Sequence, residues 1–191
     1  RTEARMGSRR DDGLGVPHLR SSEPGPERGI RHPCSARQTP MTDPQPALRR
    51  ASPADLSAVD LYALLRLRVD VFVVEQQCTY PELDGRDLEP RTEHLWFEQD
   101  GEVLAVLRVL DDGAARAIGR VATAAGARGR GLAARLVTEV LASYGDGPLH
   151  LDAQAHLEGW YERFGFRRSG EGYVEDGIPH VPMHRPPSSP R

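Results

Sequence analysis

The sequence predicts one mixed α/β domain, and three observations support this. The chain of 191 residues lies within the size range of a single domain, and its hydrophobic fraction of 38% is enough for one core. Along the chain, apolar residues recur at the spacing of a strand in some segments and of a helix in others. The resulting order is strand, long helix, three strands, helix, strand, helix and two strands, which is typical of a mixed α/β sheet.

The first predicted elements are a short strand and a long helix. Residues 47–51 have the pattern of a strand, and Ser52-Pro53 predicts the start of an amphipathic helix. Apolar residues follow at three- and four-residue steps, namely Leu61, Leu64, Leu65, Val69 and Phe72. Residues 78–90 contain Pro, Asp and Gly at spacings typical of a loop.

The next predicted element along the chain is a hairpin of two strands. Residues 94–97 and 103–110 flank Gln99-Asp100-Gly101, and a DG turn between apolar runs favours a hairpin. The elements predicted after it are a strand at 116–123, a helix from Leu132 to Leu141 ended by Tyr144-Gly145, a strand at 149–153, a short helix at 156–164 closed by Gly165, and a hairpin of 166–174 with 178–183.

Composition excludes several classes of function. The formal charge of -3 gives no polycationic surface of the kind that binds nucleic acid, and the absence of lysine excludes Schiff-base chemistry. Cys34 and Cys78 form neither a CxxC pair nor a metal-spaced cluster, so we expect no metal site. No apolar run has transmembrane length and no signal-peptide core is present, which predicts a cytoplasmic protein without membrane contacts.

The two ends differ from the predicted domain at residues 41–185. Residues 1–40 are rich in Arg, Gly, Pro and Ser, so we expect a disordered extension, and we expect residues 186–191 to be a flexible tail. Met41 precedes the first periodic segment, which allows the extension to lie outside the native protein. The alternative is a basic arm, because the extension has eight arginines and five acids.

A glycine-rich turn at residues 128–133 lies between a predicted strand and a predicted helix. Glycines let a backbone approach a pyrophosphate, and the first N–H groups of a helix favour an anion. The turn is not a P-loop, because the final lysine and Ser/Thr are absent, and it does not fit GxGxxG. A tight packing turn that needs small residues is the alternative interpretation.

The pattern Arg-x-x-Gly-x-Ala, at Arg128, Gly131 and Ala133, resembles the signature of GCN5-related N-acetyltransferases, the GNAT superfamily. Four further blocks are similar to its ElaA subgroup: LYALLRLRVDVFVVEQ (61–76), YPELDGRD (80–87), AQAHLEGWYERFGF (153–166) and VEDGIPHVPM (174–183). The resemblance covers nearly all of residues 47–185, and it implies the acyl-CoA N-acyltransferase fold.

The resemblance also implies acetyl-CoA as cosubstrate. In this family the strand before the turn offers backbone groups to the pantetheine arm, and the turn amides hold the pyrophosphate. The corresponding positions here are Val121, Ala122, Thr123, Arg128, Gly129, Arg130, Gly131, Leu132 and Ala133. Thr123 replaces a common aliphatic residue, which matters little for a main-chain contact.

Tyr161 is the expected catalytic residue, because similar enzymes have a tyrosine at this place beside the coenzyme sulfur. A phenol with a pKa near ~10 suits protonation of a leaving thiolate. The alternative is an aromatic residue that packs beside Trp160 and Phe164.

The acceptor side is less defined. Proton acceptors near the expected cleft are Glu75, Asp84, Asp87, His94 and His180, and the family often removes this proton through water, so the choice stays open. Glu75, Asp84, Arg120 and His180 are the substrate-binding candidates. Arg120 is expected either to meet an acidic substrate group or to pair with Glu75 or another carboxylate. The acidic loop 82–89 could attract a cationic amine or simply be solvated.

We therefore expect direct acetyl transfer from acetyl-CoA to a primary amine of a small molecule or protein, in a ternary complex. Two alternatives are a non-catalytic acyl-CoA-binding regulator and a nucleic-acid binder that uses the arginine-rich arm, which the charge disfavours. Cys78 follows a helix C-terminus, where the dipole disfavours thiolate, so no acyl-enzyme is expected. The sequence does not identify the oligomeric state, which leaves monomer and homodimer open.

Overall fold

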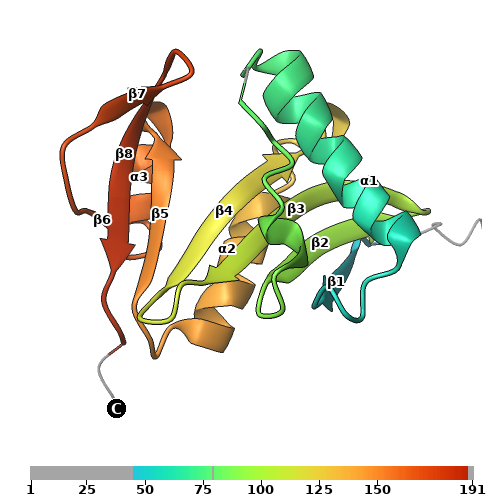
Figure 1. Cartoon of the computed structure of the whole chain (residues 1–191), viewed down its shortest axis with the longest axis horizontal. Helices are drawn as coiled ribbons and strands as arrows, with labels where there is room; N and C mark the ends of the chain where they lie inside the picture. Colours follow the sequence, from blue (N-terminus) through green and yellow to red (C-terminus); the bar gives the residue numbers. More distant parts are fainter. Residues whose placement is uncertain (1–44, 79, 189–191) are drawn as a thin grey trace, which may run out of the picture. The chain divides into compact units, whose positions relative to one another are not determined.

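β4 (Arg116–Thr123) and β5 (Leu149–Gln154) are parallel neighbours in one mixed sheet, yet they pair only at their first residues. The structure is a computed structural model that describes residues 45–78 and 80–188. The paired positions are Arg116 with Leu149 and Ala117 with His150. Beyond them the strands diverge (Figure 1), so the later residues of β4 have no strand partner on that side within the described part of the chain.

The remaining strands are β1 (Ala47–Ala51), β2 (Glu93–Gln99), β3 (Glu102–Asp111), β6 (Arg167–Arg168), β7 (Tyr173–Glu175) and β8 (Ile178–Arg185). Their order is β1-β2-β3-β4-β5-β8-β6, and β7 pairs with β8. Within the described chain every strand pair other than β4–β5 is antiparallel. The predicted mixed α/β class is therefore confirmed.

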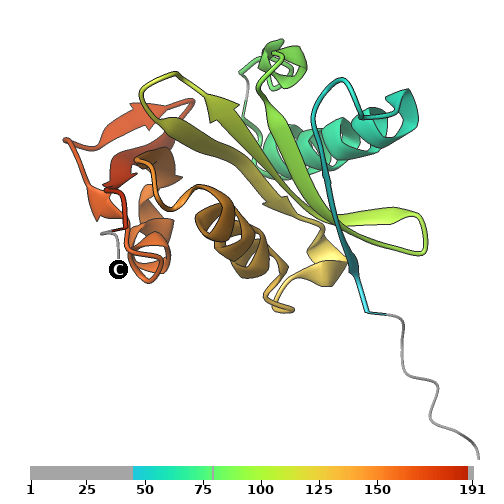
Figure 2. The same ribbon diagram turned by 90° about the horizontal axis from the view of Figure 1, so that it is seen from below.

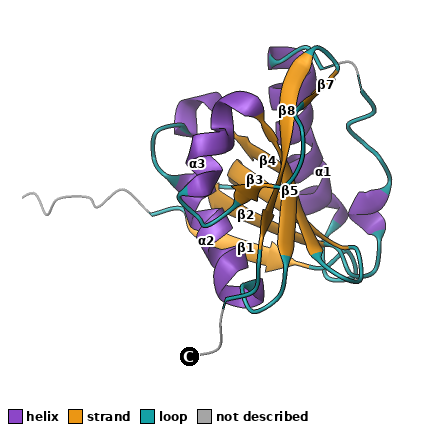
Figure 3. Ribbon diagram, turned by 90° about the vertical axis from the view of Figure 1, so that its left-hand side faces the viewer, coloured by secondary structure: helices purple, strands orange, loops and turns teal. Residues whose placement is uncertain are grey.

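Helices cover both faces of the sheet (Figures 2 and 3). α1 (Ala58–Arg68) packs on β3 and β4 from one face, and α2 (Leu132–Tyr144) packs on β2, β3 and β4 from the other. α3 (Glu158–Glu162) contacts β5 and β6. Alternate residues of β3 face opposite layers. Val106 belongs to the same buried cluster as Leu64 of α1, and Leu107 belongs to the same cluster as Leu136 of α2. Among the described residues, none of the helices has the length and hydropathy needed to cross a membrane.

The predicted start of the first helix is wrong. Ser52 and Asp55 form a turn instead, and the helix begins at Ala58. Ser57 is the N-cap, because its hydroxyl accepts the Asp60 backbone N–H at 3.1 Å. At its other end α1 continues into a π-helix, Val69–Glu75. Ser52 and Ser57 are both possible N-cap residues. The helix uses Ser57, which lies nearer the regularly spaced apolar residues of the helix.

Two predicted hairpin turns are present in the structure, and both have the positive φ angles that a tight hairpin turn requires. Asp100 and Gly101 both have positive φ, of 53° and 79°, which matches the twist of the β2–β3 hairpin. Asp176 and Gly177 repeat this geometry between β7 and β8, with φ of 48° and 81°.

The predicted continuous strand at residues 166–174 is also wrong. The structure has two short strands there, β6 and β7, which both pair with β8. Between them the Ser169 N–H donates to the Pro182 carbonyl at 2.9 Å. The chain then approaches β8 so closely that a side chain at Gly172 would lie 3.1 Å from the His180 carbonyl. Glycine fits this close approach better than a larger residue, and the strand is interrupted in this segment.

Candidate functional site

A β-bulge in β4 lies beyond the last residue that pairs with β5. Val106 pairs with Ala122 and Arg108 with Gly119, so Arg120 and Val121 together oppose one residue of β3. Arg120 has a φ of 53°, in the left-handed region that non-glycine residues rarely adopt. Such a conformation costs about 1 kcal/mol or more, which the surrounding contacts must offset.

A cavity of about 650 Å³ lies on the helix-turn side of the bulge, and we call it the turn cavity. Its walls are the π-helix, the end of β4, the glycine-rich turn, the start of α2, and α3. Of the predicted cofactor residues it brings together Val121, Ala122, Thr123, Arg128, Gly129, Gly131, Leu132 and Ala133. Arg130 does not line this cavity and donates instead to the Gln99 side chain at 3.0 Å.

The glycine turn presents unpaired backbone donors to the turn cavity. Gly129 and Gly131 have φ of 75° and 73°, and Gly131 is the N-cap of α2 without a side-chain cap. The first helical hydrogen bond runs from the Arg135 N–H to the Gly131 carbonyl. The N–H groups that precede it have no helical acceptor, and the positive end of the helix dipole adds to them. This end of the cavity suits a phosphate.

Arg128 connects three walls of the turn cavity. Its Nη2 lies 2.6 Å from Glu75 Oε2, and its Nε donates to the Thr123 carbonyl at 3.2 Å. The hydrogen bond from Arg128 lowers the pKa of Glu75. Glu75 was expected beside the acceptor, but it lines the turn cavity and is paired there.

A second cavity of about 430 Å³ lies on the other side of the bulge, and we call it the loop cavity. Both cavities are lined by Gln76, Val121, Leu157 and Tyr161, so they meet at the bulge. Tyr161 is 6% exposed, and burial raises its pKa. Its ring also packs edge-on against Trp160, with centroids 4.7 Å apart. Both expected roles of Tyr161, chemical and packing, are compatible with this position.

Three arginines and three carboxylates form a closed ring of alternating charges beside the loop cavity, which we call the charge ring. In order around the ring they are Arg68, Glu82, Arg120, Asp84, Arg108 and Asp87. They come from α1, the 78–92 loop, β3 and β4. The ring is mostly buried: Arg68 and Arg108 are 0% and 2% exposed. Because every charge has two opposite neighbours, the loop is fixed to the sheet electrostatically.

The ring accounts for two of the predicted substrate residues. Arg120 pairs with Glu82 and Asp84, at 2.8 and 3.2 Å, rather than with Glu75. Its guanidinium also lies over the Tyr80 ring, 5.1 Å from the centroid. Burial opposes ionisation of Asp84, but the hydrogen bonds from Arg108 outweigh it and lower the pKa of Asp84 to about 2.

The fold places the two predicted histidine proton acceptors in different environments. His94 is fully buried, lines neither cavity and lies 3.1 Å from the Asp87 carbonyl, and burial lowers its pKa. His180 does line the loop cavity. Its Nδ1 donates to the Ile178 carbonyl at 2.9 Å, so the neutral ring carries its free lone pair on Nε2.

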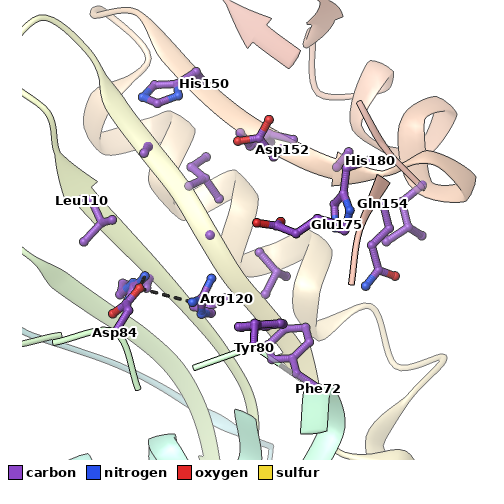
Figure 4. Close-up of a pocket in the computed structure, with 18 of the residues that line it drawn as sticks. Phe72, Tyr80, Asp84, Leu110, Arg120, His150, Asp152, Gln154, Glu175 and His180 are labelled. Atoms are coloured by element: carbon purple, nitrogen blue, oxygen red, sulfur yellow. Dashed lines mark hydrogen bonds and ion pairs between the residues drawn. The ribbon is translucent and has the colours of Figure 1, made fainter. Parts of the chain in front are cut away.

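The wall opposite the charge ring (Figure 4) was missed by sequence reasoning except for His180. It contains Asp152 of β5, Tyr173 and Glu175 of β7, and His180 of β8. The Tyr173 and His180 rings stack at 5.8 Å. A signal was present, because Asp152 is a polar position that alternates with buried Leu151 and Ala153. The described residues contain no group of side chains suited to a metal ion.

Comparison with known proteins identifies the class. A profile described as an acetyltransferase (GNAT) domain matches residues 59–186. A UPF0039 protein of Mycobacterium tuberculosis is 52% identical over 147 residues, which are 74% of this chain and 94% of the relative. Protein ElaA of Escherichia coli is 42% identical over 139 residues, 69% of this chain and 91% of ElaA.

Solved structures agree. An acyl-CoA N-acyltransferase from Pseudomonas aeruginosa has a TM-score of 0.69 at 44% identity, over 74% of this chain and 99% of the other. The crystal structure of E. coli ElaA also has a TM-score of 0.69, at 38% identity and the same coverage. Fold and relatives together define an N-acyltransferase. The chain belongs to the GNAT superfamily and, within it, to the ElaA-like subgroup.

Proposed function

We propose that this protein transfers an acetyl group from acetyl-CoA to a primary amine by direct attack in a ternary complex. The observation that supports this most strongly is the meeting of two cavities at Tyr161 and the β4 bulge. A donor in the turn cavity and an acceptor in the loop cavity can then be bound at once, with their reacting ends adjacent. Direct transfer needs this proximity and no covalent acyl-enzyme.

The donor is held by backbone groups. The pyrophosphate binds at the free N–H groups around Gly131, and Arg128 adds positive charge at the same end. The pantetheine arm follows the part of β4 that β5 leaves unpaired, and it adds hydrogen bonds there. The thioester carbonyl then reaches the bulge at Val121.

The acceptor nitrogen attacks the thioester carbon with its lone pair, and the carbon–sulfur bond breaks as the amide forms. A backbone N–H at the bulge stabilises the tetrahedral oxyanion, a contribution on the order of 3 kcal/mol. Burial keeps the Tyr161 phenol protonated at neutral pH. The same desolvation raises the pKa of the leaving thiol, so the phenol can donate its proton to the thiolate. The amine can lose its proton to water, and His180 Nε2 is a further acceptor on the wall of the loop cavity.

The test is a pair of measurements on the full chain. Coenzyme A should raise the melting temperature in proportion to ligand concentration, and acetyl-CoA should release free thiol when amines are added. Tyr161→Phe should retain the thermal shift and release thiol roughly 100-fold more slowly. Absence of any shift with coenzyme A would contradict the proposal. A shift without thiol release for any amine would identify the non-catalytic acyl-CoA-binding regulator instead.

A further inference from the structure

The positive charges that line the loop cavity are all neutralised by the protein itself. Arg108 and Arg120 belong to the charge ring, whose three arginines balance three carboxylates. Arg86 pairs with Glu89 at 2.8 Å and with Asp112 at 2.6 Å. A substrate carboxylate would therefore have to displace an existing partner to gain an arginine.

The opposite wall has the reverse character. Asp152 and Glu175 point into the cavity from β5 and β7 (Figure 4), and among residues 45–78 and 80–188 neither forms an ion pair. The two carboxylates contribute to raised pKa values of neighbouring side chains. Burial and then the negative charge of Asp152 raise the pKa of Tyr173 to about 12. Burial is the main cause that raises the pKa of Cys78, and Glu175 contributes least of the three carboxylates that add to it. The unbalanced charge of the cavity is thus negative.

The same wall offers contacts for hydrocarbon. The stacked rings of Tyr173 and His180 lie beside the two carboxylates, and Phe72 and Leu157 line the cavity toward the bulge. Aromatic faces also attract cations. The lining of the cavity therefore combines apolar side chains with an anionic wall.

We propose, building on the proposed acetyl transfer, that the acceptor is a small aliphatic diamine or polyamine, and that Asp152 and Glu175 determine this specificity. One amine, as the neutral base, attacks the thioester carbon beside Tyr161. The second nitrogen remains an ammonium ion and binds at Asp152 and Glu175. The products are the monoacetylated amine, which keeps one positive charge, coenzyme A thiol and one proton released from the reacting ammonium.

The test compares three amines of equal chain length: butane-1,4-diamine, butylamine and 4-aminobutanoate. The kcat/KM for the diamine should exceed that for butylamine by about tenfold, beyond the factor of two that its two equivalent amines provide. The carboxylate compound should be the poorest. The preference should fall at high ionic strength, because salt screens exposed charge pairs.

Variants locate the effect. Asp152→Asn and Glu175→Gln should each lower kcat/KM for the diamine about threefold, and together roughly tenfold, with the butylamine value unchanged. Asp146→Asn removes the same charge outside the cavity and should change neither value. Equal use of all three amines by the wild type, or equal loss for diamine and butylamine in the variants, would overturn this inference and leave acetyl transfer intact.

Binding provides the second readout. With coenzyme A bound, calorimetric titration should show tighter binding of butane-1,4-diamine than of butylamine, and the Asp152→Asn/Glu175→Gln protein should lose that difference. If neither amine is turned over, this comparison still decides: a coenzyme A complex without preference for the diamine contradicts the inference. A protein that shows no thermal shift with coenzyme A would instead contradict the proposed function.

Discussion

The Gln154 side-chain amide donates a hydrogen bond of 2.9 Å to Gln76 Oε1. It joins β5 to the end of the π-helix, and so connects the two halves of the sheet where β4 and β5 have separated. Gln76 lines both cavities and Gln154 lines the loop cavity. The bond therefore spans the wall of the loop cavity at the place where the two cavities meet.

Gln154→Leu should lower the free energy of unfolding by about 1 kcal/mol, because it leaves Gln76 Oε1 without its partner. Urea titration of Gln154→Leu, Gln76→Leu and the double variant measures the coupling between the two side chains. Additive losses would show that the hydrogen bond is not formed in solution. We also expect a higher KM for the amine and unchanged coenzyme A binding in Gln154→Leu.

Glu82→Gln should be strongly destabilising, by about 3 kcal/mol, because it leaves Arg68 and Arg120 with too few carboxylates in a buried place. The matched control is Glu102→Gln, whose pair with Arg66 is exposed and should contribute under about 1 kcal/mol. Chemical denaturation of both variants makes the comparison. Similar small losses would mean that the charge ring contributes little to stability.

Gly131→Ala should lower stability by about 1 kcal/mol and weaken coenzyme A binding. A Cβ there meets nothing within 4 Å, so the cost comes from the φ of 73° and from distortion of the turn amides. Gly126→Ala is the control, since its Cβ also meets nothing within 4 Å and its φ is not positive. Equal thermal shifts with coenzyme A in both variants would exclude the turn from donor binding.

Asp84 should make stability depend on pH in the acid range. Its pKa falls from 3.8 to about 2 on folding, so the folded state favours the ionised carboxylate. The stabilisation is complete above the unfolded value and is lost as pH falls through the folded one. The stability difference between wild type and Asp84→Asn should therefore shrink from pH 5 toward pH 2. A constant difference across that range would contradict the lowered pKa.

Local signals in the sequence predicted much of the fold. Asp100-Gly101 encodes its hairpin because both positions need positive φ, and the strands at 47–51 and 116–123 match the structure. The predictions failed where the structure depends on contacts between residues that are distant in sequence. Whether Ser52 or Ser57 caps α1 depends on packing, and the break between β6 and β7 depends on how closely that segment approaches β8.

The candidate site also has a part that local sequence predicts and a part that depends on distant contacts. The glycine turn and Tyr161 were found because each is a short motif, and the structure lines one cavity with both. The partners of Arg120 could not be found, since Glu82 and Asp84 are distant in sequence and their approach depends on how the loop folds. The expectations for residues 1–40, and that for Cys34, lie outside the described residues.

The charge ring also limits how this enzyme can diverge. Removal of the charge at any ring position leaves a buried charge without its balancing partner. The cavity wall formed by the charge ring can therefore change only by several substitutions together. Among the residues that the structure describes, Asp152 and Glu175 form no ion pairs, and they lie on separate strands. Under the proposed acceptor assignment, a protein engineer who wishes to redirect acceptor choice should therefore diversify β5 and β7 and leave α1, β3 and the 78–92 loop untouched.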